Sequence, residues 1–239
     1  MDIYALTDVG CVRSINQDYV FATKDKVGKL PNLFIVADGM GGHKAGDFAS
    51  KYTVETFTDL VRKENREGPI SIIQEGIKTV NKMLLSKANE SEDYEGMGTT
   101  LVIATLIKNS LYIANVGDSR LYILSDELSQ ITRDHSYVEE MVDIGEMNRD
   151  DDIYKSKKNI ITRAIGAGPE VMADFFEIRI KPGDIILMCS DGLTGMVSDD
   201  KIKAILELDI SIKEKCEMLI KTANDNGGKD NVGVVLIKP

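Results

Sequence analysis

Aspartate residues recur in this sequence where short apolar runs meet turns rich in Gly, Asn or Ser. A single Asp-Gly pair of this kind is most often a turn residue that hydrogen bonds its own backbone, but five such positions are harder to explain in that way. Carboxylates that converge at strand ends repel one another strongly at low dielectric, and a divalent cation with oxygen ligands, Mg²⁺ or Mn²⁺, relieves that repulsion. The pattern therefore predicts an all-carboxylate metal site, which we expect to be binuclear. The five positions are Asp18, Asp38, Asp118, Asp191 and Asp230.

Motifs of several other common sites are absent from the sequence. There is no HExxH pair, no EF-hand spacing, no GxxxxGK(S/T) loop, no GxGxxG fingerprint and no GxSxG elbow. The three cysteines, Cys11, Cys189 and Cys216, form no CxxC pair, which argues against a zinc site and against a disulfide framework. Of the two histidines, His135 is expected to order the start of the following helix, and neither it nor His43 is expected to be catalytic.

The charge balance and the length of the apolar runs exclude further classes of protein. The 239-residue chain carries a formal net charge of −10, whereas a nucleic-acid-binding protein presents a basic face. Its first four residues lack the basic start of a signal peptide. Its longest apolar runs, such as 33–37 and 185–189, are far shorter than the roughly 18 residues of a membrane span. We therefore expect a cytoplasmic monomer with one domain, 1–239, no nucleic-acid partner and no membrane insertion.

Hydrophobic periodicity predicts an α+β fold. Because the strands fall in adjacent groups and the helices come in pairs, antiparallel sheets covered by helices fit better than an alternating parallel sheet. Residues 146–159 form the most polar segment, which we interpret as an exposed excursion. We expect strands at 3–8, 19–23, 33–37, 99–107, 111–116, 120–124, 175–180, 184–189 and 232–237, and helices that start at 45 and after 69, with others at 137–144, 199–208 and 212–223.

Arg13 is the arginine nearest to this pattern, five residues before Asp18 in the same polar loop. A guanidinium beside a carboxylate–metal cluster is suited to bidentate capture of a phosphate. From the spacing alone, an arginine paired with a surface acid is an equally good interpretation.

Seven short motifs occur along the chain, at residues 10–18, 36–43, 97–100, 115–120, 161–166, 190–194 and 229–231. In this order they resemble the metal-dependent serine/threonine protein phosphatases, the PPM or type 2C family, in their compact bacterial form. Each motif alone is weakly specific, but seven in order are highly specific. The resemblance implies a central antiparallel β-sandwich flanked by helix pairs in four layers (αββα). It also implies a metal site at one end of the sandwich and a mobile flap at 146–159 near the site.

Matched by position, the resemblance makes most of the aspartates metal ligands. Asp38 would bridge two metal ions, Asp191 and Asp230 would hold one of them, and the backbone carbonyl of Gly39 would help to hold the other. Asp18 would act mainly through metal-bound waters. The implied cofactors are two Mn²⁺ or Mg²⁺ ions per chain.

The resemblance also implies roles beyond the metal pair. Arg13 would grip the phosphate, so that Arg13, Asp18 and Asp38 would be the catalytic residues. Asp118, together with Asp191, matches the place where bacterial members can bind a third metal ion.

Two positions depart from the eukaryotic pattern of the family. Met40 stands where eukaryotic relatives carry a histidine proposed as general acid, so that role is vacant here. Gln17 stands where they carry a glutamate, which would weaken binding of the second metal. Both changes look typical of the bacterial branch.

The implied activity is hydrolysis of phosphoserine and phosphothreonine in proteins by a metal-activated water, in opposition to a membrane-bound serine/threonine kinase. One alternative is a catalytically weak relative that only binds phosphoproteins, which the presence of all the expected metal ligands disfavours. The other is an unrelated two-metal phosphodiesterase, since such enzymes also use carboxylate clusters. The net charge of −10 disfavours its polyanionic substrate.

Overall fold

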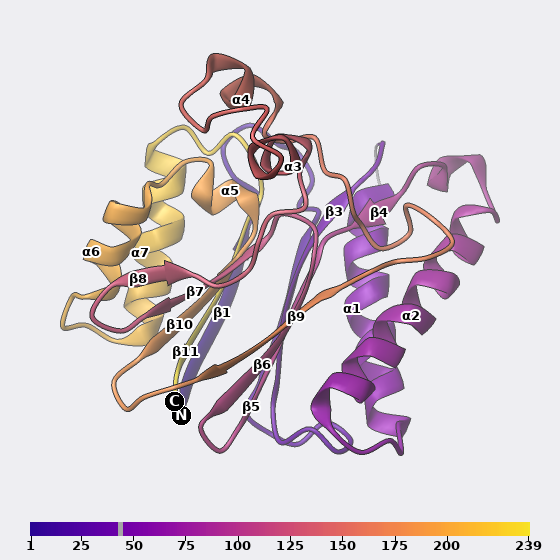
Figure 1. Cartoon of the computed structure of the whole chain (residues 1–239), viewed down its shortest axis with the longest axis horizontal. Coiled ribbons are helices and arrows are strands. Elements are labelled where there is room, and N and C mark those ends of the chain that lie inside the picture. Colours follow the sequence, from indigo (N-terminus) through magenta and orange to yellow (C-terminus); the bar gives the residue numbers. More distant parts are fainter. Residues whose placement is uncertain (43–44) are drawn as a thin grey trace.

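Two antiparallel sheets pack face to face, and helices cover the outer face of each sheet (Figure 1). The computed structural model describes residues 1–42 and 45–239, so the interpretation of His43 lies outside the described residues. The arrangement is the four-layer αββα sandwich that the resemblance to the type 2C family implies, and it confirms the antiparallel sheets that the sequence pattern predicts.

The two sheets are built from segments that lie far apart in the sequence. The first has the order β1 (Asp2–Asp8), β11 (Val232–Lys238), β10 (Ile185–Cys189), β7 (Arg120–Leu124) and β8 (Leu128–Gln130). The second has the order β2 (Asp18–Thr23), β3 (Leu33–Met40), β5 (Leu101–Ile107), β6 (Ser110–Val116) and β9 (Asp174–Arg179), with the short β4 (Gly98–Thr99) paired to β3.

Each sheet is covered by its own pair of helices. Side chains of α1 (Ala45–Lys63) and α2 (Pro69–Ala88) pack on the second sheet, and those of α6 (Asp199–Leu206) and α7 (Ile212–Asp225) pack on the first. The short helices α3 (Tyr137–Asp143), α4 (Asp152–Lys157) and α5 (Asp191–Thr194) lie at the end of the sandwich opposite both termini (Figure 1). A single 3-10 turn spans Glu92–Tyr94. In the described part of the chain, no helix has the length and apolarity needed to cross a membrane.

Strand β3 shows why its sequence is an unbroken apolar run. Leu33, Ile35 and Ala37 pack toward α1 and α2, while Phe34 and Val36 pack between the two sheets. Successive side chains of a strand point to opposite faces, so a strand buried on both faces needs apolar residues at every position. This double burial fixes β3 firmly, and the end of β3 carries part of the site.

The structure also corrects several predicted boundaries. The predicted strand 33–37 is too short, because β3 continues to Met40 where Gly39 and Met40 pair with β4. The polar excursion 146–159 is exposed as predicted, but it contains the helix α4. Neither β8 nor α5 is predicted, since β8 has no fully buried residue and α5 is a single turn.

Candidate active site

The strand register places acidic residues from both sheets at one end of the sandwich. Asp18 and Asp38 are directly opposite partners in the β2–β3 pair. Ser190 follows β10 in the other sheet, and its hydroxyl donates a 2.6 Å hydrogen bond to Asp18 Oδ2. The same hydroxyl accepts a 2.8 Å hydrogen bond from the backbone of Gly233. The bond to Asp18 crosses from one sheet to the other, and the bond from Gly233 holds Ser190 within its own sheet, so together they fix Asp18 beside the strand end that carries Asp191.

The five aspartates form one interacting electrostatic cluster. Burial is the largest cause that raises the pKa of Asp38 well above its usual range, and the charges of the other four add to it. Burial, with the charges of Asp191 and Asp230, raises the pKa of Asp18 to about 7 against the opposing effect of its hydrogen bonds. Burial and Asp191 raise the pKa of Asp118 to about 8. The predicted convergence of these carboxylates is therefore present in the structure.

The residues present fit a pair of oxygen-ligated cations. Within the described residues, Asp18 Oδ1 and Asp118 Oδ1 are buried and accept no hydrogen bond, although buried acceptors are nearly always satisfied. No three His, Cys, Asp or Glu side chains of residues 1–42 and 45–239 are already gathered as ligands around one point. Instead, the carboxylate of Asp38 interacts electrostatically with those of Asp18 and Asp191, and carboxyl groups held this close share a proton. A divalent cation can replace that proton and use the unpaired oxygens.

Arg13 lies at the rim of the cluster. Its Nη2 donates a 2.9 Å hydrogen bond to Asp230 Oδ2, and 53% of its side chain is exposed. Asp230, the acid that pairs with Arg13, is a member of the cluster. The structure therefore brings Arg13 beside the aspartates, as the sequence predicts.

Sequence reasoning missed the residues that hold the backbone at Asp38. Its N–H donates a 2.9 Å hydrogen bond to Thr100 Oγ1, and its carbonyl accepts one of 2.9 Å from Thr99 Oγ1. The next residue, Gly39, approaches α1 so closely that a Cβ there would lie 1.9 Å from the carbonyl oxygen of Gly46. Because any side chain here would clash with α1, only glycine fits this position. The motif at residues 97–100, Met-Gly-Thr-Thr, is the one sequence signal for these threonines.

Asn231 is a second residue that received no role from the sequence. Its side chain accepts a 2.8 Å hydrogen bond from the backbone of Gln17 and donates bonds of 2.9 and 3.0 Å to the carbonyls of Val9 and Ile15. These three bonds hold the loop that carries Arg13 against the start of β11.

The prediction for His135 is wrong in its detail. The start of α3 is capped by the hydroxyl of Ser136. His135 is buried, its Nδ1 accepts a 3.1 Å hydrogen bond from the backbone of Gly117, and its Nε2 lies 3.2 Å from Asp174. Burial lowers the pKa of His135, in keeping with a neutral ring whose Nδ1 accepts. This histidine therefore holds the turn that carries Asp118.

Comparison with known proteins assigns this fold and site to a class. The family model for protein phosphatase 2C matches residues 12–230. Because the match spans most of the chain, the protein belongs to the protein phosphatase 2C family and is a metal-dependent protein phosphatase.

Its relatives place it beside the bacterial members of that family. Serine/threonine phosphatase stp of Listeria innocua is 40% identical over 97% of this chain and 93% of its own. Protein phosphatase PhpP of Streptococcus pneumoniae is 37% identical over 99% and 97% of the two chains. The solved structure of serine/threonine phosphatase Stp1 from Staphylococcus aureus has a TM-score of 0.92 at 35% identity and covers 100% of this chain and 94% of that one.

Proposed function

We propose that this protein hydrolyses phosphoserine and phosphothreonine in proteins with water activated at two divalent cations, Mn²⁺ or Mg²⁺. The observation that carries the proposal is the convergence of five mutually repelling aspartates in a member of a metal-dependent phosphatase family. The relatives named serine/threonine phosphatase support the substrate class. The structure of the PstP catalytic domain in complex with 2 manganese ions, 34% identical to this chain, supports Mn²⁺.

The proposed role of each ligand is the one that the resemblance of the motifs implies. Asp38 interacts electrostatically with both Asp18 and Asp191, which suits a carboxylate that bridges two cations. Asp191 and Asp230 would hold one cation, the carbonyl of Gly39 would help to hold the other, and Asp18 would act mainly through bound water. When bound, the cations lower the pKa of water and offset the charge of the phosphate.

Two side chains of the protein bear on how the phosphate ester reacts: Arg13 can orient it, and Ser190 cannot form a covalent intermediate with it. Arg13 is more than half exposed and bonds Asp230 through one nitrogen, so its guanidinium can present other N–H groups to a phosphate. Ser190 is fully buried, and its hydroxyl already bonds Asp18 and Gly233. A nucleophile must reach the phosphorus atom, so Ser190 cannot form a phosphoenzyme.

The finer parts of the proposal rest on the resemblance of the motifs. We propose one catalytic domain over residues 1–239, acting as a cytoplasmic monomer on phosphoproteins made by a membrane-bound serine/threonine kinase. The family match argues against the unrelated two-metal phosphodiesterase. An inactive phosphoprotein-binding relative is distinguished from an active enzyme by the metal assay that follows.

Metal dependence is the first test of the proposed reaction. The purified protein should hydrolyse p-nitrophenyl phosphate with Mn²⁺ or Mg²⁺, lose that activity in excess chelator and regain it when Mn²⁺ is returned, because the activated water depends on the cations. Asp38→Asn should be inactive under all three conditions. Hydrolysis that survives exhaustive metal removal would contradict the proposal.

Substitution of Arg13 tests capture of the phosphate. Arg13→Ala should lower kcat/KM about tenfold to a hundredfold, since charge-assisted hydrogen bonds to the phosphate are lost. It should not weaken Mn²⁺ binding, and Arg13→Lys should recover little because an ammonium cannot make the planar two-bond grip. Arg62→Ala, which removes an exposed arginine paired with Asp59 on α1, is the matched control. Wild-type kinetics in Arg13→Ala would assign Arg13 to a purely structural ion pair.

Substitution of Asp118 tests the proposed third cation. Met40 cannot donate a proton, yet departure of a serine or threonine alkoxide needs a proton or an equivalent positive field. A third cation held by Asp118 would supply that field or acidify a water that gives the proton. Asp118→Ala should therefore lower kcat on a phosphothreonine peptide about a hundredfold but lower it much less on p-nitrophenyl phosphate, whose leaving group departs unprotonated. Asp126→Ala, at an exposed turn, is the control. Equal losses on both substrates with a lower melting temperature would instead mean that Asp118 only stabilises its turn.

A further inference from the structure

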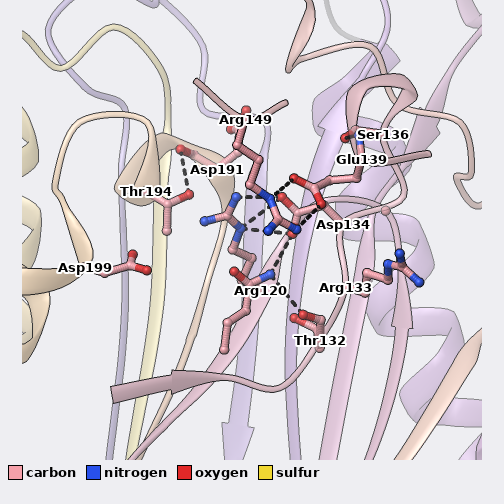
Figure 2. Close-up of polar contacts among 12 residues, drawn as sticks. Arg120, Thr132, Arg133, Asp134, Ser136, Glu139, Arg149, Asp191, Thr194 and Asp199 are labelled. Carbon is pink, nitrogen blue, oxygen red and sulfur yellow. Dashed lines mark hydrogen bonds and ion pairs between the residues drawn. The ribbon is translucent and has the colours of Figure 1, made fainter. Parts of the chain in front are cut away.

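Glu139 on α3 is a buried acid that lies outside the aspartate cluster. Its carboxylate accepts hydrogen bonds from Arg149 through both oxygens, 3.1 Å from Nε and 2.7 Å from Nη2, and it also accepts one from the hydroxyl of Tyr154. Figure 2 shows Glu139 and Arg149 pointing toward each other. Arg149 and Tyr154 both belong to the excursion 146–159, so one carboxylate fastens that segment at two points. We call these three residues the Glu139 clasp.

The clasp is charged and complete at neutral pH. The hydrogen bond from Arg149 is the largest cause that lowers the pKa of Glu139, so the carboxylate stays ionised. Burial and the contact with Glu139 raise the pKa of Tyr154 to about 12, so its hydroxyl keeps the proton that it donates. A buried carboxylate held by a two-bond guanidinium contact is costly to leave unpaired, whereas most described side chains around it in 146–157 are exposed. The clasp is therefore a principal anchor of the segment.

The clasped segment forms a wall beside the aspartate cluster. A cavity of about 210 Å³ is lined by Asp118 and Asp191 of the cluster and also by Tyr154 and Lys158 of the segment. A second cavity of about 440 Å³ is lined by Glu139 and also by Tyr154. Because Tyr154 lines both cavities, its position sets the shape of the space next to Asp118 and Asp191.

Two residues shared by these cavities are held by each other rather than by the clasp. Arg120 and Asp134 line both of them, and their side chains form an ion pair with hydrogen bonds of 2.9, 3.0 and 2.6 Å (Figure 2). Arg120 and Asp134 are thus fixed by their own bonds, while the position of the segment 146–159 depends on the clasp. Loss of the clasp should move Tyr154 and Lys158 without disturbing the aspartates.

We propose that Glu139 is a positioning residue for protein substrates. Its clasp on Arg149 and Tyr154 holds the segment 146–159 beside the cavity that Asp118 and Asp191 line, and this cavity receives the substrate residues next to the phosphorylated one. The inference rests on the proposed phosphatase function and adds a determinant of substrate preference to it. We expect a small aryl phosphate to depend mainly on the aspartate cluster and Arg13, because it carries no peptide chain that could extend to this wall. A phosphopeptide needs both, so the clasp should affect the two substrates differently.

The test compares Glu139→Gln with Glu140→Gln, the same substitution at the exposed next position of α3. Glutamine keeps the size of the side chain but replaces charge-assisted bonds with weaker neutral ones. With Mn²⁺, Glu139→Gln should raise KM for a phosphothreonine peptide about fivefold to tenfold, with kcat nearly constant and a much smaller change on p-nitrophenyl phosphate. Hydrogen exchange of the amides in 146–157 should become faster. Glu140→Gln should match the wild type in every measurement.

Two further variants keep the test decisive if Glu139→Gln folds poorly. Tyr154→Phe removes one bond of the clasp and keeps the ring, so it should raise the peptide KM by about twofold to threefold. Arg149→Met should resemble Glu139→Gln, and the double variant should be no worse than either single one, since both remove the same contact.

The outcomes separate this inference from the function on which it rests. An unchanged peptide KM in a folded clasp variant, whether or not hydrogen exchange is faster, would overturn the positioning role. Equal losses on peptide and aryl phosphate would also overturn it, because the clasp would then shape the aspartate cluster itself. Failure of the wild-type protein to hydrolyse either ester with Mn²⁺ would instead overturn the proposed function.

Discussion

Repulsion among buried and half-buried carboxylates is the constraint on which the rest of this structure depends. Five aspartates from both sheets meet at one end of the sandwich, where burial and like charge raise the pKa of Asp18 to about 7 and that of Asp118 to about 8. Such a cluster destabilises the fold unless protons or cations neutralise it. The same unfavourable energy becomes a driving force for cation binding, because a cation removes the repulsion and satisfies the orphaned oxygens.

The sandwich is what keeps these carboxylates together despite their repulsion. Strands β3 and β10 are buried on both faces, so the strand ends beside Asp38 and Asp191 cannot separate without opening the core. Ser190 then ties Asp18 of one sheet to the end of β10 in the other, and Asn231 ties the loop of Arg13 to the start of β11. The cluster is therefore held by hydrogen bonds that do not themselves involve a cation.

Most of the fold and the acidic cluster could be predicted from sequence because their signals are local. An apolar run such as 33–37 and a strand-end acid such as Asp38 are visible within ten residues. The pairing of Arg13 with Asp230 was not visible, since 217 positions separate them and many acids compete for one arginine. The continuation of β3 to Met40 depends on β4, and the partners of Glu139 lie in a polar segment without periodicity. These features are decided by tertiary contacts rather than by local pattern.

The most direct measurement is the number of protons released when Mn²⁺ binds. Groups whose pKa values are raised to about 7 and about 8 carry protons near pH 7 in the absence of a cation, and a cation bound among them lowers those pKa values and so releases the protons. Calorimetric titration near pH 7 in buffers of different ionisation enthalpy should therefore show release of at least about one proton per chain, with less release as the pH rises. Tight Mn²⁺ binding with no proton release would contradict the account of a cluster strained by its own charge.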